Sequence, residues 1–322
     1  MDWYNWAYGA VSNFSAAVAQ RLVDQCELKF NEAIISNISN EGFDLSLQGS
    51  LTGTGPVEAK IEFTEPVKVE WEGSNIATIE LPSILAAAGE GVPNYCPNAH
   101  LIITDRGKFT QFSIFLWHNP SFSWTIFTDK LRVAVTSLGS VFENVILRKN
   151  VTFRAFDALS DVGIRRFELP CDVDVDAEGG GIQIEIDSEI PCHAQLGINL
   201  GSATFTTKFK GVTVGRLKTT QNLILSPNSV TNTHLTGRIV PQSGSDLEVI
   251  GELFSKYLAG ENQTLQVIGE SVHPSESESA SSSPSPVGWL TAAIQSLTLE
   301  VILPGQKFEV RGLSIYLLLL SF

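Results

Sequence analysis

Apolar and polar residues alternate strictly along most of this chain, and this pattern constrains the fold more than any other feature of the sequence. Over residues 43–47 the apolar side chains point one way and the polar ones between them the other, which is the period of a half-buried β-strand. The same alternation recurs around Val69, Val133, Ile184 and Leu299. One buried and one wet face is typical of antiparallel sheets, so the sequence predicts a mainly β protein made of antiparallel β-sandwiches.

Helical periodicity occurs in a few short stretches. One surrounds Phe112 and ends at Pro120, because proline cannot continue a helix. Another starts at Ser245, where Ser245 and Glu248 have the spacing of a capping box, and stops at Gly260. We therefore expect one or two short helices beside each sandwich.

The two helical stretches belong to an internal repeat. FSIFL at Phe112 recurs as FSKYL at Phe254, 142 residues later, and NAHL at Asn98 recurs as NTHL at Asn232, 134 residues later. Two copies of one unit account for a length of 322 residues, since domains average roughly 150. The predicted organisation is an aromatic segment at 1–13, a first sandwich at 14–156, a second sandwich at 158–303 with a Ser/Glu/Pro-rich loop at 273–286, and a tail at 304–322.

A third helix-to-strand pattern begins near Trp289 and is similar to the pattern that opens the first copy. We therefore expect the chain to be part of a longer repeat array. The Ser-rich and Glu-rich tract before it cannot bury apolar area and is predicted to be a mobile linker.

Charge and apolar runs exclude several classes of protein. The chain has 35 acidic and 21 basic residues, a net charge of −14, and no Lys/Arg cluster that could follow a nucleic-acid backbone. We expect no nucleic-acid partner. The longest apolar run, at 313–322, is too short to cross a bilayer, and the first residues lack the pattern of a secretory signal.

The sequence holds no recognisable catalytic or metal-binding motif. The Asp-rich stretch before the Gly turn has Ala177 and Gln183 where a calcium loop needs Gly and Glu. His100 and His234 hold equivalent repeat positions, which favours a structural role, and neither a G-x-S-x-G elbow nor a phosphate loop is present. We expect no enzymatic activity, no cofactor and no metal.

Two kinds of covalent modification are predicted. Cys171 and Cys192 flank two strands joined by a Gly-rich turn, which predicts a disulfide across a hairpin, with four buried free thiols as the alternative. N-glycosylation sequons stand at Asn13, Asn37, Asn150 and Asn262. Sequons are used in proteins that pass through the secretory route.

These segments together resemble a known family. The strings GFDLSLQGSLTGTGPVEAKIEF, ITDRGKFTQFSIFLWHNPSFSW, LGINLGSATFTTKFKGVTVGRL and GWLTAAIQSLTLEVILPG are similar to those of an uncharacterised fungal vacuolar-membrane protein family. The resemblance covers about residues 14–304 and implies tandem β-sandwiches of the late-embryogenesis-abundant (LEA-like) type on the luminal side of the vacuolar membrane. It further implies a non-enzymatic module of a membrane-anchored protein that binds lipid or a membrane-protein partner, and it supplies no catalytic residues.

The helices are rich in aromatic residues, which predicts an apolar groove for a lipid. Phe115 and Trp117 widen the apolar face around Phe112, and surplus apolar surface either packs on a neighbouring unit or lines a cleft. The predicted groove residues are Phe109, Phe112, Phe115, Leu116, Phe254, Tyr257 and Leu258. We expect an acyl chain to enter between helix and sheet edge, with the first sandwich as the better binder.

Two other functions stay open at this stage. The first is an adhesion or carbohydrate-binding sandwich, in which Trp3, Trp6 and Tyr8 would stack on sugar rings. The second is a hydrolase whose catalytic residues are scattered along the sequence. The oligomeric state is open in each case.

Overall fold

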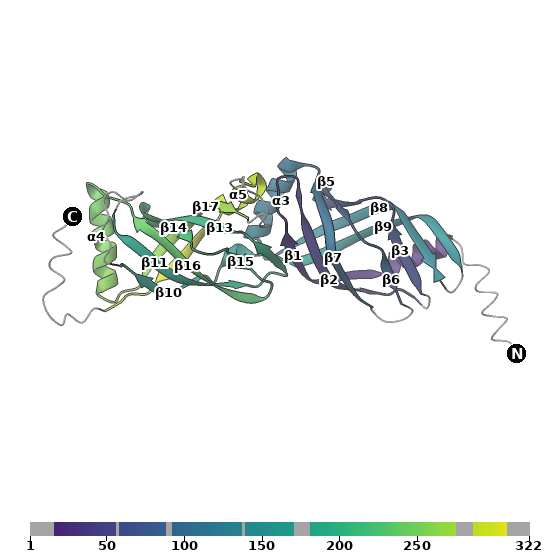
Figure 1. The fold of residues 1–322 in the computed structure, drawn as a ribbon, viewed down its shortest axis with the longest axis horizontal. Helices are drawn as coiled ribbons and strands as arrows, with labels where there is room; N and C mark the ends of the chain where they lie inside the picture. The colour runs from purple at the N-terminus through teal and green to yellow at the C-terminus, as the bar shows by residue number, and fades with distance from the viewer. Residues whose placement is uncertain are drawn as a thin grey trace.

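The computed structural model describes residues 16–55, 58–87, 92–136, 139–170, 181–274 and 286–307. Two β units follow each other along the long axis of an elongated molecule (Figure 1). The predicted aromatic segment, Asn13, Cys171, most of the Ser-rich loop and most of the tail lie outside the described residues. Predictions made for those segments stay predictions.

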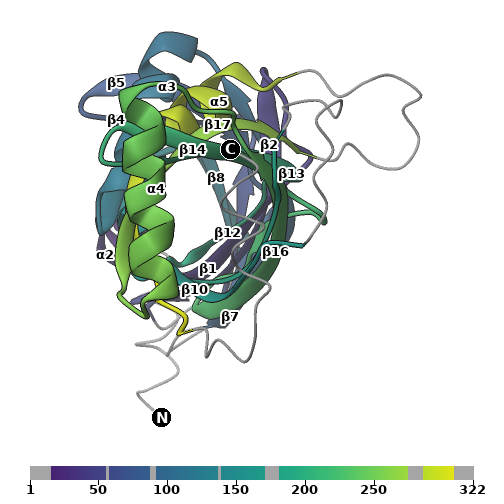
Figure 2. The ribbon, with the colours of Figure 1, turned by 90° about the vertical axis from the view of Figure 1, so that its left-hand side faces the viewer.

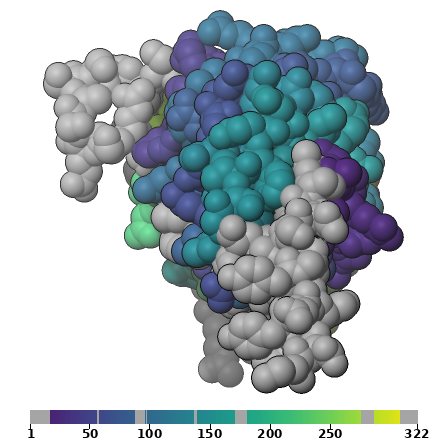
Figure 3. Space-filling view, turned by 90° about the vertical axis from the view of Figure 1, so that its right-hand side faces the viewer, coloured from purple at the N-terminus to yellow at the C-terminus, as the bar shows by residue number. Residues whose placement is uncertain are grey.

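Unit 1 contains nine strands and two helices among the described residues. They are α2 (Ala16–Gln25), β1 (Glu27–Ser36), β2 (Gly42–Thr52), β3 (Ala59–Phe63), β4 (Val67–Trp71), β5 (Ser74–Glu80), β6 (Ile84–Ala86), β7 (Val92–Ile103), α3 (Arg106–His118), β8 (Ser121–Val135) and β9 (Ser140–Arg154). Figure 3 views the outer end of this unit, where the teal atoms of β8 and β9 occupy the centre and purple atoms of the first described residues lie at one side.

Unit 2 follows a short 3₁₀ turn. Its elements are η2 (Asp157–Leu159), β10 (Gly163–Glu168), β11 (Gln183–Cys192), β12 (Leu196–Asn199), β13 (Ser202–Phe209), β14 (Val212–Thr219), β15 (Ile224–Leu225), β16 (Ser229–Ile239), α4 (Ser245–Leu258), β17 (Gln263–His273), α5 (Gly288–Gln295) and β18 (Thr298–Leu303). The edge strands β10 and β18 lie next to each other, so this sheet is barrel-like.

The two units share one topology, and the predicted fold class is confirmed. Neighbouring strands of unit 1 run β1-β2-β7-β5-β4-β8-β9, and those of unit 2 run β10-β11-β16-β14-β13-β17-β18. Helix α3 connects β7 to β8, and α4 connects β16 to β17, so the repeated FS-x-aromatic-L string occupies the same topological position twice. Viewed along the long axis, the strands of both units surround a common direction and α4 runs across the near end (Figure 2).

The register of the strands repeats as well. His100 lies opposite Asp44 in the β2–β7 ladder, and His234 lies opposite Asp187 in the β11–β16 ladder. In both pairs the imidazole Nδ1 is 2.6 Å from a carboxylate oxygen. Both histidines therefore make equivalent cross-strand contacts, as the repeat analysis expected, and they fix a residue-by-residue correspondence between the units.

The two equivalent helices have different surroundings. Helix α3 starts after Asp105, whose side chain accepts a hydrogen bond from the Lys108 amide, and it is buried at the junction beneath Trp289 of α5. Helix α4 covers the outer end of unit 2 and keeps a charged outer face. The predicted capping box of α4 is wrong, because Gly244 is the N-cap and Ser245 already lies inside the helix without a capping hydrogen bond.

The junction is a strand pairing that the alternation did not predict. Strand β12 of unit 2 joins the sheet of unit 1, parallel to β1, with Ala33 opposite Leu196 and Ile35 opposite Ile198. Strand β15 extends it, so the first sheet contains eleven strands. One buried apolar cluster consequently runs across the junction, and the units form a continuous core.

Candidate functional site

The residues predicted to line a groove in unit 1 are instead packed in its core. Phe109 and Phe112 are 1% and 2% exposed, Leu116 is buried, and Phe115 packs against the Trp71 ring at 5.5 Å between centroids. Phe112 also touches the rings of four neighbouring aromatic residues. Phe109 packs on Trp289 of the next unit, and none of these four residues lines the cavities described below, whereas Trp117 of the same helix lines the cavity of unit 2.

The predicted groove residues of unit 2 are packed in the same way. Phe254 and Leu258 lie partly buried against the outer core, and the Tyr257 ring packs edge-on to Phe167 at 5.2 Å. The Tyr257 hydroxyl donates to the side-chain oxygen of Gln306 at 2.7 Å, and burial raises the pKa of this phenol. Helix α4 therefore closes the end of the barrel and leaves the apolar space elsewhere.

A first apolar cavity lies inside unit 2, between its sheet and the junction. Its volume is about 70 Å³, and its lining is formed mainly by aliphatic side chains of β10, β11, β14, β16, β17, β18 and α5, with the rings of Trp117 of α3 and Phe205 of β13. Ser188 and Thr207 line it too, but each hydroxyl donates to a backbone carbonyl at 3.1 Å. The polar groups of these two residues are already satisfied, so the cavity favours apolar contents.

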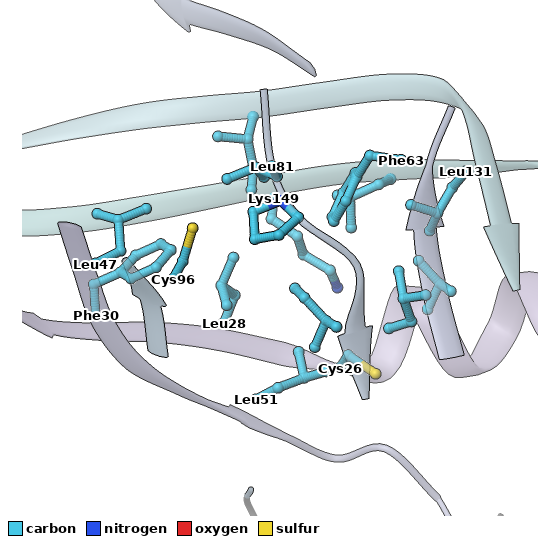
Figure 4. A pocket seen from close by; sticks show the side chains of 16 residues that line it. Cys26, Leu28, Phe30, Leu47, Leu51, Phe63, Leu81, Cys96, Leu131 and Lys149 are labelled. Atoms are coloured by element: carbon cyan, nitrogen blue, oxygen red, sulfur yellow. The ribbon is translucent and has the colours of Figure 1, made fainter. Parts of the chain in front are cut away.

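A second apolar cavity lies inside unit 1, at the end away from the junction. Its volume is about 50 Å³, and Figure 4 shows the two thiols of Cys26 and Cys96 and the ammonium of Lys149 among apolar side chains. Burial raises the pKa of both thiols. Lys149 is the one charged residue in the lining of either cavity.

Side-chain volume explains why the two cavities occupy different places. Following the ladders from the His–Asp pairs, Phe122 and Trp124 of β8 correspond to Leu265 and Val267 of β17. On the partner strands, Phe153 corresponds to Val301. Aromatic rings therefore fill the interior of unit 1 below α3, while smaller aliphatic groups leave space at the same positions of unit 2. The predicted entry of an acyl chain between helix and sheet edge in the first unit is corrected accordingly, because aromatic rings fill that space.

The predicted disulfide is not formed, because Cys192 is a free, buried thiol 3.9 Å from the Leu196 carbonyl oxygen. Glu168 pairs with Glu185, which lies ~23 Å along β11 from Cys192 at about 3.3 Å per residue. Cys171, the other half of the predicted pair, lies outside the described residues. The hairpin partner of β11 among the described residues is β10 (Gly163–Glu168), which precedes Cys171, and not a strand between the two cysteines.

Three sequon asparagines have exposed side chains. They are Asn37, Asn150 and Asn262. Each also makes a hydrogen bond, to Asp44, from Thr125 and from the Gly305 amide respectively. Their surface positions are compatible with the predicted modification, which stays untested.

The described residues contain no group of three His, Cys, Asp or Glu side chains that could hold a metal ion. Among their helices none has the length and hydropathy needed to cross a bilayer.

One family profile matches part of the chain. Residues 74–207 match the family described as "Protein of unknown function (DUF3712)", a range that runs from β5 of unit 1 to β13 of unit 2. No curated protein matches the sequence. The match therefore spans the junction between the units and names no activity.

Solved structures with detectable similarity are distant. They include the YadV chaperone (10% identity, 76% of this chain, 92% of that chain, TM-score 0.20) and the E. coli chaperone DraB (10%, 76%, 90%, 0.19). A BSP domain of a biofilm-associated protein is 8% identical over 80% of this chain and 53% of that one, with a TM-score of 0.19. TM-scores this low carry no argument about function.

Proposed function

We propose that this protein is a non-enzymatic binding module for apolar chains, and that the interior of unit 2 holds the chain. The observation that carries this proposal is the cavity of about 70 Å³ with an almost wholly apolar lining. Close-packed interiors have few voids larger than a water molecule, so a cavity of this size is an available binding space. It supports the lipid-binding expectation at a different location from the predicted groove.

The size of the cavity sets the expected affinity. A water-sized group needs roughly 10–15 Å³ of such space, so the cavity accommodates roughly five methylene-sized groups. Each buried methylene contributes ~0.8 kcal/mol, which is about fourfold in affinity. Binding should strengthen about fourfold per carbon along a series of linear alcohols until the chain fills the cavity, and then level off.

The site is tested by introducing into the unit 2 cavity an aromatic ring like the one at the equivalent position of unit 1. Val267→Phe places a ring where unit 1 has Trp124, and it should remove the unit 2 site from the number of sites at which octanol displaces a neutral fluorescent chain probe. Ile302→Phe adds the same ring to an outward-facing position that is 58% exposed, and it should leave binding unchanged. A number of probe sites that Val267→Phe leaves unchanged would remove unit 2 as the site.

The carbohydrate-binding alternative gains no support from the described tryptophans. Trp71, Trp117, Trp124 and Trp289 are all buried, at 1–9% exposure, so their faces cannot stack on a sugar ring. Trp3, Trp6 and Tyr8 lie outside the described residues. Unit interiors rather than exposed rings are therefore the better-supported binding surface.

We also propose, from the family resemblance, that the module lies on the luminal side of a vacuolar membrane and works beside a membrane-protein partner. Exposed sequons at Asn37, Asn150 and Asn262 support a route through the secretory pathway. Treating the protein from a fungal host with an endoglycosidase should increase its gel mobility. A mobility unchanged by the enzyme and by Asn→Gln substitution at all three sites would contradict this location.

A further inference from the structure

Lys149 occupies a position where the strand otherwise presents apolar side chains to the interior. Strand β9 turns Val145, Leu147, Val151 and Phe153 inward, and Lys149 continues that series of alternate residues. Its side chain lines the apolar cavity of unit 1 (Figure 4). A charge placed against an apolar cavity costs free energy, so the position calls for a physical reason.

The present partner of this ammonium is a neutral group. Its Nζ donates to the backbone carbonyl of Asp24 at 2.7 Å, in the last turn of α2, where a cation is favoured. Within the described residues Lys149 forms no ion pair with a carboxylate. Two of its three N–H donors therefore remain for another acceptor.

The neighbouring carboxylates have partners of their own. Glu27 pairs with Lys29 at 3.1 Å, and the Asp24 carboxylate accepts a hydrogen bond from Gln20 at 2.8 Å. Of these two lysines, the charge of Lys29 is thus balanced by a carboxylate and the charge of Lys149 is not.

The cavity opens to the surface along a seam beside Lys149. Strands β1 and β9 are neighbours that share no ladder of hydrogen bonds among the described residues. An open polar groove of about 570 Å³ follows the seam, lined by residues 24–31 and 149–152. Cys26, Leu28, Phe30 and Lys149 line both the groove and the cavity, so the two spaces meet there.

Unit 2 lacks this charge at the corresponding position. In unit 1, Lys149 of β9 lies opposite Ile126 of β8. Ile126 corresponds to Gly269 of β17 in unit 2, and extending the β17–β18 ladder by one residue places Leu297 opposite Gly269. Leu297 lines the cavity of unit 2 as an ordinary apolar side chain. The two units therefore have equivalent positions that differ in charge: the ammonium of Lys149 lines the cavity of unit 1, and the apolar Leu297 lines the cavity of unit 2.

We propose that the cavity of unit 1 takes a single-chain amphiphile with an acidic head group, its chain in the cavity and its carboxylate or phosphate in the seam on Lys149. This inference rests on the proposed binding of apolar chains and names the ligand class for one of the two interiors. The chemistry is a charge-assisted hydrogen bond from the ammonium to an anionic oxygen at the boundary between apolar and polar space. Acidic lipids from a membrane and free fatty acids share this head-group chemistry.

The experiment compares hexanoic acid, hexyl phosphate and hexanol, whose chains match the small cavity, as competitors of a neutral fluorescent probe at pH 7.5, in the Val267→Phe background that removes the site in unit 2. We expect the acid and the phosphate to bind about tenfold more tightly than the alcohol. Lys149→Leu, which copies unit 2, should equalise the ligands, whereas Lys29→Leu should leave the preference intact. Lys149→Gln, which keeps a donor for the Asp24 carbonyl, should also remove the preference without loss of folding.

The outcomes separate this inference from the function on which it rests. If neither alcohol nor acid binds to the wild-type chain, the proposed function fails. If both bind equally, or if Lys149→Gln keeps the acid preference, the assignment of Lys149 as the head-group residue fails alone. A preference for the phosphate over the acid assigns the site to phospholipid-type heads, and the reverse assigns it to fatty acids.

Discussion

Replacing Gln195 by Ala should loosen the junction between the units. Gln195 precedes β12 and reaches both edge strands of the seam in unit 1: its side-chain oxygen accepts from the Arg154 amide at 2.8 Å, and its side-chain nitrogen donates to the carbonyls of Phe30 and Asn31 at 3.2 and 3.3 Å. Its backbone adds bonds to Arg154 and Ala33, and these survive the substitution. The side chain therefore acts as a bridge between β1 and β9.

The magnitude follows from those three side-chain bonds. The two weaker ones share a single nitrogen, so we count about two effective bonds at ~1 kcal/mol each, or about 2 kcal/mol. Hydrogen exchange followed by mass spectrometry should show protection at the Ala33 and Arg154 amides falling by roughly thirtyfold. Strand β14, which packs mainly on β13, β16 and α4 of unit 2, should keep its protection.

Two control variants sharpen this test. Gln221→Ala removes an exposed glutamine and should leave exchange at the seam unchanged. Gln195→Glu keeps the acceptor for Arg154 but loses both donors, so it should fall between wild type and Gln195→Ala. Unchanged exchange at Ala33 and Arg154 in Gln195→Ala would refute the bridging role.

Three further predictions address the core and the pH dependence of stability. The hydrogen bond to His234 is the largest cause that lowers the pKa of Asp187. The stabilising contribution of Asp187 is therefore complete above the unfolded pKa of about 3.8, and it is lost as the pH falls through the lower pKa of the folded state. Asp187→Asn should flatten the decrease of the urea midpoint that is measured between pH 6 and pH 3. Trp289→Ala removes a 7%-exposed ring that packs on Phe109 at 5.2 Å, and it should lower the free energy of unfolding by ~3–5 kcal/mol in urea titrations. Trp124→Val copies Val267 and should open a cavity below α3 that binds the neutral probe, at the lower end of the same cost because the indole N–H has no hydrogen-bond partner to lose.

Local sequence patterns predicted the helices and strands well, but they did not predict which distant strands pair. Alternation marks the strands because each has one buried face, and the repeated strings mark equivalent helices because both copies use the same connection. Strand β12 has four residues, and its partner β1 lies more than 150 positions earlier, so no local period identifies that pairing. The capping box failed because Gly244, with a positive φ of 58°, starts the helix one residue before the expected cap.

The sites were partly visible in the sequence, though by other signals than the aromatic helix. Lys149 breaks an otherwise apolar series of alternate residues in β9, and that irregularity can be read without a structure. Aligning the two copies strand by strand also shows aromatic residues of unit 1 replaced by smaller ones in unit 2. The register needed for that alignment comes from the His–Asp ladders, which only the structure supplies.

Duplication gives both units the same order of seven strands, so the difference between their interiors below the equivalent helices arises from side-chain volume. Where unit 1 places Phe122, Trp124 and Phe153, the rings interlock with α3 and form the junction core. That packing holds unit 2 against unit 1. The space that remains inside unit 1 therefore lies at the end away from the junction, beside the seam and Lys149. At the outer end of unit 2, α4 presents a polar surface instead of a packed junction. Smaller side chains leave the cavity of unit 2 near the junction. The demand for a rigid junction thus explains why the interior of unit 1 is filled below its helix, while the interior of unit 2 keeps an apolar cavity near the junction.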